Sequence, residues 1–524
     1  MTQTAPLAAV QPENLTATPP ADGAPGPTFD SMNPRTGDVV DTHPVHSAED
    51  VEAAVGRARE AARWWGGLTF DERAERLLAW KGVLTRHLAQ LADLMHRETG
   101  KPHADATMEI ALAIDHLHWA ATKAEKHLKR RSVSPGMLMV NQQAWVEYKP
   151  LGVVGVIGPW NYPVFTPMGS IAYALAAGNA VVFKPSEYTP GVGEWLAMTF
   201  RQAVPDHPVL QVVTGLGETG AALCRADVDK VAFTGSTATG KRVMAACAET
   251  LTPVVIEAGG KDAVIVAEDA DVDAAADAVL WGACSNAGQT CTGVERVYVH
   301  ERVHDEFVDV LVRKAREITA HEGADSHIGP ITMPKQLDVI RGHIADALDR
   351  GGRALVGGAD AVGDRFVQPT VLVDVPEDSD AVCEETFGPT VTVAKVRSVE
   401  EAVDRTNAGK YGLGSTVFSR SRGLEIAEQI RSGMTSINAV IAFAAVPALP
   451  FGGVGDSGFG RIHGPDGLRE FTYAKAITRQ RFKPALPLTS FDRPDDTDTK
   501  LAQIMTMLHG RGTLLPRVAG RRKD

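Results

Sequence analysis

The chain has 524 residues, of which 44% are apolar and 23% charged, an ordinary composition for a globular protein. This length exceeds what one hydrophobic core usually supports, so we expect two or three packed units. The formal net charge of −12, with only short basic runs, argues against nucleic acid as a partner. No apolar segment approaches the about 18 residues needed to span a bilayer, and the N-terminus lacks a signal pattern, so we expect a cytoplasmic protein.

The five cysteines form no CxxC pair, and their odd number predicts reduced thiols rather than a disulfide framework or a structural zinc site. We predict no metal site. Four of the cysteines lie in apolar or ordinary sequence contexts, and we interpret them as small buried hydrophobic residues. These four are Cys224, Cys247, Cys284 and Cys383.

The N-terminal part of the chain predicts a flexible arm followed by two helices. Residues 1–28 are rich in Pro, Ala and Thr. With little periodic hydrophobicity, burial of their side chains cannot offset the entropy cost of ordering the segment. The segment 47–50 resembles a capping box and is followed by apolar residues at helical spacing. Thr69 and Glu72 mark the start of a second helix, whose apolar stripe runs over 77–95.

From residue 151 the pattern changes to short continuous apolar runs separated by turns and helix-length segments. Such runs predict strands that are covered on both faces, and the intervening helices predict a parallel, doubly wound sheet. The runs of the first set are 153–157, 181–183, 211–213, 231–233 and 254–256. A second α/β set begins near 261, with strands predicted at 263–266, 297–299 and 366–373 and a helix over 303–318.

Two segments predict features outside these sheets. Apolar residues alternate over 137–148, and we expect this segment to pair with another chain. The tail from about residue 484 is polar and Pro-rich, and its apolar stretch 501–508 is too short to cross a membrane.

Cys291 and Glu257 are the residues most indicative of chemistry. Cys291 ends the Gly/Gln turn 286–291, and Glu257 ends an apolar strand immediately before two glycines. A carboxylate at that place is unusual unless it projects into a cleft, where it could act as a base. A thiol nucleophile with a carboxylate base is what oxidation of an aldehyde through a thioester requires. For Cys291 alone, a buried small hydrophobic residue remains the alternative.

Asn161 follows a buried strand, in the region where α/β sheets place ligands. Trp160 and two prolines hold it rigidly, so its amide could donate to an oxyanion, although a simple turn asparagine is the alternative. Lys184 and Glu187 follow the next strand and could hydrogen-bond a ribose diol, but exposed Lys/Glu pairs usually contribute little.

Two glycine patterns compete as phosphate sites. The segment 215–220 matches GxGxxG, but no acidic partner follows at the spacing of a dinucleotide fingerprint. The segment 235–241 almost spells a P-loop, but Arg242 stands where Mg²⁺ coordination needs a hydroxyl. Ser236 nevertheless lies at a predicted helix start, where N–H groups could receive a pyrophosphate, with an ordinary N-cap as the alternative.

Taken together, these motifs resemble the NAD(P)-dependent aldehyde dehydrogenase superfamily from about residue 30 to about residue 480. The segments 384–389, 436–438 and 450–453 contribute further motifs of this family in family order. The resemblance implies an α/β fold with two doubly wound open-sheet domains, one for the cofactor and one for catalysis. It also implies a small β arm for oligomerisation, and hence a homodimer or homotetramer.

The resemblance implies roles for individual residues. Cys291 would be the nucleophile, Glu257 the general base, and Asn161 would form the oxyanion hole with the backbone N–H of Cys291. The implied cofactor is NAD or NADP. In its site Lys184 and Glu187 would hold the adenosine ribose, Ser236 the pyrophosphate and Glu385 the nicotinamide ribose, with Phe387 beside the nicotinamide ring. Pro159, Trp160, Ser186, Gly235 and Gly240 complete the predicted contacts.

The resemblance also suggests a division of the chain, with 1–28 as the flexible arm and 484–524 as a C-terminal tail. Residues 29–136 and 151–260 would form the NAD(P)-binding domain and 261–450 the catalytic domain. Residues 137–150 and 451–483 would form the oligomerisation arm and a closing segment.

The apolar segment 440–446 has no Arg or Lys to pair with a substrate carboxylate, which favours a neutral aliphatic or aromatic aldehyde. Oxidation of succinate semialdehyde is the alternative within the family. From other classes, a P-loop-like nucleotidase and a catalytically retired binding protein stay open. Cofactor choice is open too, because Glu187 would repel a 2′-phosphate whereas Lys184 could accept one.

Overall fold

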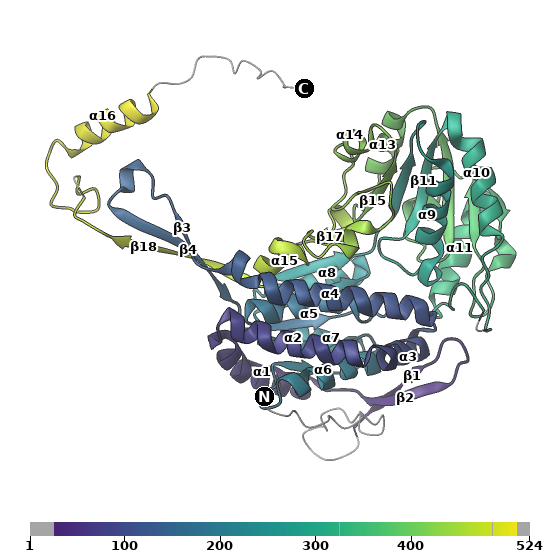
Figure 1. The fold of residues 1–524 in the computed structure, drawn as a ribbon, viewed down its shortest axis with the longest axis horizontal. Coiled ribbons are helices and arrows are strands. Elements are labelled where there is room, and N and C mark those ends of the chain that lie inside the picture. Colours follow the sequence, from purple (N-terminus) through teal and green to yellow (C-terminus); the bar gives the residue numbers. More distant parts are fainter. Residues whose placement is uncertain (1–25, 324, 485, 511–524) are drawn as a thin grey trace, which may run out of the picture. The chain divides into compact units, whose positions relative to one another are not determined.

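The computed structural model describes residues 26–323, 325–484 and 486–510 (Figure 1). The predicted arm at residues 1–28 therefore lies almost entirely outside the described residues, as does the end of the tail. The described chain forms two compact units. One lies within Met1–Leu128 and Lys149–Tyr473, and the other within Lys129–Tyr148 and Ala474–Asp524.

The larger unit opens with a hairpin of β1 (Thr28–Met32) and β2 (Val39–Pro44), followed by four helices rather than two. The predicted capping box at Ser47 is present, and Thr69, the predicted start of the second helix, forms another: each side chain accepts the N–H of the residue three positions later. The single stripe predicted to run to residue 95 is wrong, since the chain breaks at His87, whose φ and ψ are −108° and 19°. The helices are α1 (Ala48–Gly67), α2 (Phe70–Arg86), α3 (Leu88–Thr99) and α4 (His103–Leu128).

The first large sheet has six strands in the order β17-β9-β8-β5-β6-β7, and all its pairs are parallel except β17 with β9. Its strands are β5 (Val153–Ile157), β6 (Ala180–Lys184), β7 (Leu210–Val212), β8 (Lys230–Gly235), β9 (Val254–Ala258) and β17 (Gly458–Phe459). The connecting helices are α5 (Phe165–Ala177), α6 (Pro190–Ala203), α7 (Gly217–Arg225) and α8 (Thr237–Ala248), with α15 (Gly464–Glu470) following β17.

The second large sheet has seven strands in the order β12-β13-β14-β11-β10-β15-β16, parallel except for β12 with β13. Its strands are β10 (Asp262–Val266), β11 (Val294–His300), β12 (Arg353–Val356), β13 (Thr370–Val373), β14 (Thr390–Val396), β15 (Ser415–Phe418) and β16 (Ser436–Ile437). The stretch predicted as a strand over 366–373 becomes extended within the sheet only from Thr370.

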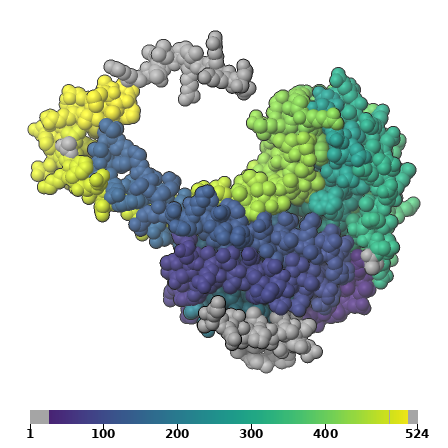
Figure 2. All heavy atoms as spheres, viewed as in Figure 1, coloured from purple at the N-terminus to yellow at the C-terminus, as the bar shows by residue number. Residues whose placement is uncertain are grey.

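Helices cover both faces of this second sheet, as the continuous apolar runs predict. In β10, Val264 and Val266 face a core shared with α9 and α10, whereas Ala263 and Ile265 face a core shared with α13 and α14. Figure 2 shows these teal and green segments gathered in one lobe, beside the purple segments that form the N-terminal hairpin and helices. The helices are α9 (Val272–Cys284), α10 (Glu301–Ala315), α11 (Gln336–Asp349), α12 (Asp380–Cys383), α13 (Val399–Asn407) and α14 (Gly423–Ala427).

The smaller unit contains most of a three-stranded sheet in the order β18-β4-β3 and the helix α16 (Thr497–His509). Its strands are β3 (Arg131–Val133), β4 (Gln142–Pro150) and β18 (Thr472–Gln480). The segment 137–148 is thus a 3₁₀ turn followed by a strand that pairs within its own chain. Its pairing with another chain and the domain boundaries stay predictions. Among the described helices, none combines the length and apolarity that a membrane span requires.

The topology explains where a ligand can bind. The strands β5, β6, β8 and β9 are parallel neighbours, so their carboxyl ends lie at one edge of the first sheet. The loops that follow these strands carry the Asn, Lys, Ser and Glu residues singled out above. Cys291 lies just before β11 of the second sheet, so the two sheets supply different parts of one site.

Candidate active site

A cleft of about 900 Å³ runs along this edge and is lined by Cys291, Glu257 and Asn161 together. Lys184, at the end of β6, lines the same cleft. In the strand order, β6 and β9 are separated by β5 and β8, and at about 4.8 Å per strand this spacing spans roughly 14 Å. The cleft is therefore long enough for an extended ligand that reaches from Lys184 to the cysteine.

A strained turn presents Cys291 to the cleft. Asn286, Ala287 and Gly288 have consecutive positive φ values of 51°, 55° and 71°, a conformation that only glycine adopts freely. Gln289 holds the turn closed, because its backbone N–H and its side-chain amide both donate to the carbonyl of Asn286, at 3.1 and 2.9 Å. As a result the Cys291 side chain is half-buried at the cleft instead of sealed in the core.

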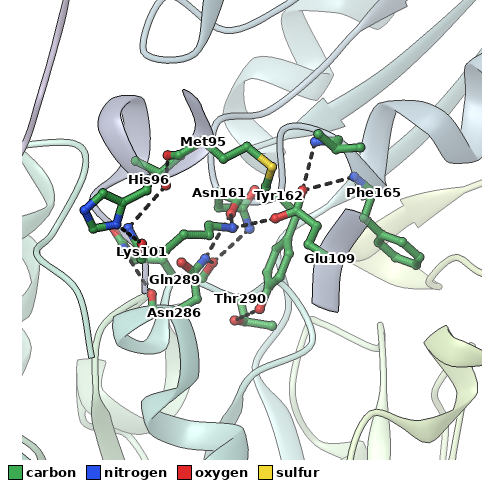
Figure 3. A network of polar contacts seen from close by, with 12 residues as sticks. Met95, His96, Lys101, Glu109, Asn161, Tyr162, Phe165, Asn286, Gln289 and Thr290 are labelled. Atoms are coloured by element: carbon green, nitrogen blue, oxygen red, sulfur yellow. Dashed lines mark hydrogen bonds and ion pairs between the residues drawn. The ribbon is translucent and has the colours of Figure 1, made fainter. Parts of the chain in front are cut away.

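Two hydrogen bonds join the Asn161 loop to this turn (Figure 3). The Asn161 amide donates one N–H to the carbonyl of Gln289 at 2.9 Å, and the carbonyl of Asn161 accepts from the Asn286 amide at 3.0 Å. The second N–H of the Asn161 amide has no acceptor within the described part of the chain. It is free to donate to a group bound at Cys291.

Glu257 projects from the end of β9, where it lies in register with Thr234 of β8 and Gly458 of β17. It is 3% exposed, and neither carboxylate oxygen has a hydrogen-bond partner of standard geometry among the described residues. Burial raises the pKa of Glu257 to about 7, and the nearby side chains of Cys291 and Thr234 offset part of that rise. A carboxyl group with this pKa can both take and give a proton near neutral pH.

The Cys291 thiol is held in its protonated form by the same surroundings. Burial and, after it, the negative charge of Glu257 raise the pKa of Cys291 well above that of an exposed thiol. A nucleophilic thiolate at this site therefore needs a base, and Glu257 is the carboxyl group in contact with the thiol.

The part of the cleft farther from Cys291 fits a dinucleotide. Its lining includes small residues on α7, namely Gly217, Gly220 and Ala221, whose side chains take up little of its space. Ser236 caps α8 by accepting the N–H of Thr239 at 3.3 Å, so the positive end of the helix dipole faces the cleft, where it favours a phosphate. Both the chemistry and the shape of this part suit NAD or NADP.

Glu385 and Phe387 lie near the cysteine end. The Glu385 carboxylate accepts the N–H of Gly260 at 2.9 Å, and the Phe387 ring meets the Trp160 ring edge-on at 5.6 Å. Glu295 fixes their loop by accepting the N–H of Phe387 at 2.9 Å. The two side chains are thereby held at the wall of the cleft.

The structure brings nearly all the predicted site residues to this cleft. Gly240 is the exception, since it packs against Ile256 and Phe233 and lets α8 approach the sheet. Two glycines of the GxGxxG match, Gly217 and Gly220, do line the cleft, at the start of α7. The residues that line it as predicted are Pro159, Trp160, Asn161, Lys184, Ser186, Glu187, Gly235, Ser236, Glu257, Cys291, Glu385 and Phe387.

The interpretation of the other cysteines needs one correction. Cys224, Cys247 and Cys284 are buried, but Cys383 is exposed, because it ends the short helix α12 at the surface. Within the described residues, no group of three or more His, Cys, Asp or Glu side chains is arranged to hold a metal ion.

Sequence reasoning missed a buried ion pair behind Asn161. Lys101 and Glu109 pair at 2.6 Å, and their side chains are 1% and 0% exposed. A signal was present, because Glu109 lies at helical spacing on the buried apolar stripe of α4, with Ala106 and Ala113. A carboxylate in such a stripe requires a partner.

Comparison with known proteins agrees with this geometry. A family model described as "Aldehyde dehydrogenase family" matches residues 21–477. The chain is 36% identical to a putative succinate-semialdehyde dehydrogenase [NADP(+)] 2 of Mycobacterium ulcerans, over 89% of this chain and 91% of the relative. It is 35% identical to a 4,4'-diapolycopene aldehyde oxidase of a Methylomonas species, over 88% of this chain and 87% of that one.

Solved structures resemble the whole fold. An NAD-dependent aldehyde dehydrogenase from Sinorhizobium meliloti superposes with a TM-score of 0.84 at 32% identity, covering 88% of this chain and 93% of that one. The predicted fold class is therefore confirmed: two large, mainly parallel sheets and a small third sheet.

Gly288→Ala should lower the midpoint of thermal unfolding and abolish activity. An added Cβ would lie 2.1 Å from the carbonyl of Gly388, and the φ of +71° disfavours a side chain. We therefore expect the free energy of unfolding to fall by about 2 kcal/mol or more. Gly56→Ala in α1 is the matched control, because nothing lies within 4 Å of its added Cβ. The free energy of unfolding of that variant should rise by about 0.5–1 kcal/mol. Equal melting midpoints for the two variants would contradict the strained turn.

Proposed function

Because the chain belongs to the aldehyde dehydrogenase family and oxidises aldehydes with NAD or NADP, we propose that Cys291 is the nucleophile of this reaction and Glu257 its base. The observation that carries the proposal is that Cys291, Glu257 and Asn161 line one cleft. Family membership favours an aldehyde-oxidising enzyme over the two hypotheses from other classes, which were a P-loop-like nucleotidase and a catalytically retired binding protein.

In the first half of the reaction the thiol proton of Cys291 passes to Glu257, and the sulfur attacks the aldehyde carbon to form a thiohemiacetal oxyanion. The free N–H of Asn161 and the backbone N–H of Cys291, which has no acceptor in the described chain, are the donors proposed to hold that oxygen. One such donor contributes about 3 kcal/mol to transition-state stabilisation. When bound, the nicotinamide ring supplies the acceptor for the hydride that leaves the carbon.

In the second half, water hydrolyses the thioester. Glu257, after releasing its first proton to solvent, takes a proton from the water as the water oxygen adds to the carbonyl carbon. The same donors again hold the oxyanion, whose collapse breaks the carbon–sulfur bond and releases the carboxylic acid and Cys291. A pKa of about 7 suits Glu257 to this repeated transfer.

The substrate we propose is a neutral aliphatic or aromatic aldehyde. The segment 440–446 contributes Phe443 and Ala444 to the interior, and the Phe443 ring lies 6.4 Å from that of Phe451. The nearby imidazoles supply no cation, because burial lowers the pKa of His116 to about 4 and lowers that of His463 well below its usual value. The Methylomonas relative is named 4,4'-diapolycopene aldehyde oxidase, and we take that name as support for this substrate class.

Succinate semialdehyde is the second candidate, and the name of the Mycobacterium ulcerans relative favours it. Its carboxylate would need a cationic partner. In the described chain, the two buried imidazoles near Phe443 and Phe451 provide none, so such a cation would have to come from elsewhere around the substrate.

Cys291→Ala should bind the cofactor, measured by quenching of tryptophan fluorescence, yet produce no NAD(P)H from any aldehyde, because the sulfur nucleophile is gone. Cys383→Ala is the matched control: it removes an exposed thiol outside the cleft and should keep full activity. Steady turnover by the Cys291→Ala protein would refute the nucleophile.

Glu257→Gln should slow both the NAD(P)H formed in the first turnover and steady turnover, by about 10²-fold or more, since the variant can neither take the thiol proton of Cys291 nor activate water. In the wild type, hydrolysis needs the carboxylate form, so steady turnover should rise with pH through about 7 and then level off. The variant should lose that inflection. An unchanged pH profile would remove Glu257 from the role of base.

Neutral aldehydes such as hexanal and benzaldehyde should have kcat/KM values at least about tenfold above that of succinate semialdehyde. The reason is the cost of burying a carboxylate without a cation. NAD(P)H formation measured with each cofactor separates the two candidates and also determines cofactor preference. A clear advantage for succinate semialdehyde would establish the second candidate.

A further inference from the structure

The buried pair of Lys101 and Glu109 contacts the loop of residues 158–164, which carries Asn161, in its middle and at its C-terminal end. Lys101 lies in the turn between α3 and α4, and Glu109 lies two turns into α4. The Lys101 ammonium donates to the backbone carbonyl of Asn161 at 2.8 Å, and one Glu109 oxygen accepts the N–H of Val164 at 2.8 Å. The same oxygen accepts the N–H of Phe165 at 3.1 Å. The pair therefore contacts the loop backbone at Asn161 and at the junction of the loop with α5 (Figure 3).

Further contacts, made through Tyr162, link the ion pair to the turn that carries Cys291. The Lys101 ammonium lies 4.5 Å from the centre of the Tyr162 ring, and the Tyr162 hydroxyl hydrogen-bonds the Thr290 hydroxyl at 3.0 Å. Thr290 immediately precedes Cys291. The ion pair thus contacts Asn161 directly and is linked to Thr290, the neighbour of Cys291, through Tyr162.

We infer that Lys101 and Glu109 are positioning residues for the Asn161 amide, holding its free N–H where an oxyanion on Cys291 would form. This inference rests on the proposed role of Asn161. A side-chain amide turns with the backbone that carries it, and the backbone carbonyl of Asn161 has two donors, Lys101 and Asn286. Removal of the Lys101 donor leaves one hydrogen bond, about which the peptide can rotate.

The alternative is that the pair only stabilises the fold. A buried ion pair adds little net stability, but a single partner left behind is costly, because its charge stays desolvated and unpaired. A lower kcat in a single variant could therefore come either from a less stable fold or from a misplaced Asn161 amide. The experiment must separate these two causes.

A double-mutant cycle supplies the first test. Lys101→Met removes the donor at similar side-chain length and should lower kcat about tenfold with little change in KM, since the oxyanion forms only after aldehyde binding. Asn161→Ala should lower kcat about 10²-fold, the range seen when one such donor is lost. If Lys101 acts through Asn161, adding Lys101→Met to Asn161→Ala should cause almost no further loss. The same loss of about tenfold in both backgrounds would overturn the inference.

A neutralised pair supplies the second test. In Lys101→Met/Glu109→Gln neither charge is left unpaired, and the amide oxygen introduced by Glu109→Gln can still accept the N–H groups of the loop. We expect the melting midpoint of this double variant to recover most of what Lys101→Met alone loses, while kcat stays about tenfold low. Recovery of both quantities together would show that the pair only stabilises the fold.

A matched pair away from the loop controls for buried charge as such. Lys230 and Glu470 form a mostly buried ion pair between β8 and α15, with side-chain exposures of 7% and 24%. Lys230→Met/Glu470→Gln should keep the wild-type kcat.

The proposed function can fail separately. If Asn161→Ala alone retains the wild-type kcat, Asn161 is no oxyanion donor, and the positioning inference falls with it. If Asn161→Ala is impaired and Lys101→Met is not, only the positioning inference is lost.

Discussion

The hydrogen bonds between the Asn161 loop and the Cys291 turn are the constraint on which the site depends. Asn161 follows β5 of the first sheet, whereas Cys291 precedes β11 of the second, so no strand pairing links them. Their relative position is set by side-chain amides that bond backbone carbonyls, from Asn161 to Gln289 and from Asn286 to Asn161. Because a misplacement of about 1 Å can cost about 10²-fold in rate, these few bonds determine whether two separate sheets make one site.

Burial of carboxyl groups away from water is the second physical feature that the site depends on. Burial raises the pKa of Glu257 to about 7 and that of Asp262 to about 8, and it raises the pKa of Glu385 as well. With its pKa of about 7, Glu257 exchanges protons near neutral pH, whereas an exposed glutamate would stay ionised and be a poor base. The surroundings that keep the Cys291 thiol protonated therefore also prepare the group that can take its proton.

The sequence was sufficient for those features that depend on local pattern. Continuous apolar runs predicted strands covered on both faces, and the carboxyl ends of those strands predicted where Asn161, Lys184 and Ser236 would lie. Features set by tertiary contact were harder to predict. The stripe at 77–95 did not reveal the break at His87, because α2 buries apolar residues before it and α3 buries apolar residues after it. The exposure of Cys383 depends on where α12 ends at the surface, which the neighbouring residues do not specify.

The Lys101–Glu109 pair illustrates why long-range polar contacts escape a reading of the sequence. Glu109 interrupts an apolar stripe, which signals a missing partner, but nothing near it in the sequence identifies Lys101 or the Asn161 loop as that partner. Charged side chains are useful here because the hydrogen bonds that they make have a defined direction. Glu109 accepts three hydrogen bonds, from Lys101, Val164 and Phe165, and these offset much of the cost of desolvating it. An apolar pair of the same volume could stabilise the fold equally well, but it would contact the loop without fixing its rotation. Hydrogen bonds to the backbone carbonyl and N–H groups specify both the position and the orientation of the loop, and orientation is what an oxyanion donor requires.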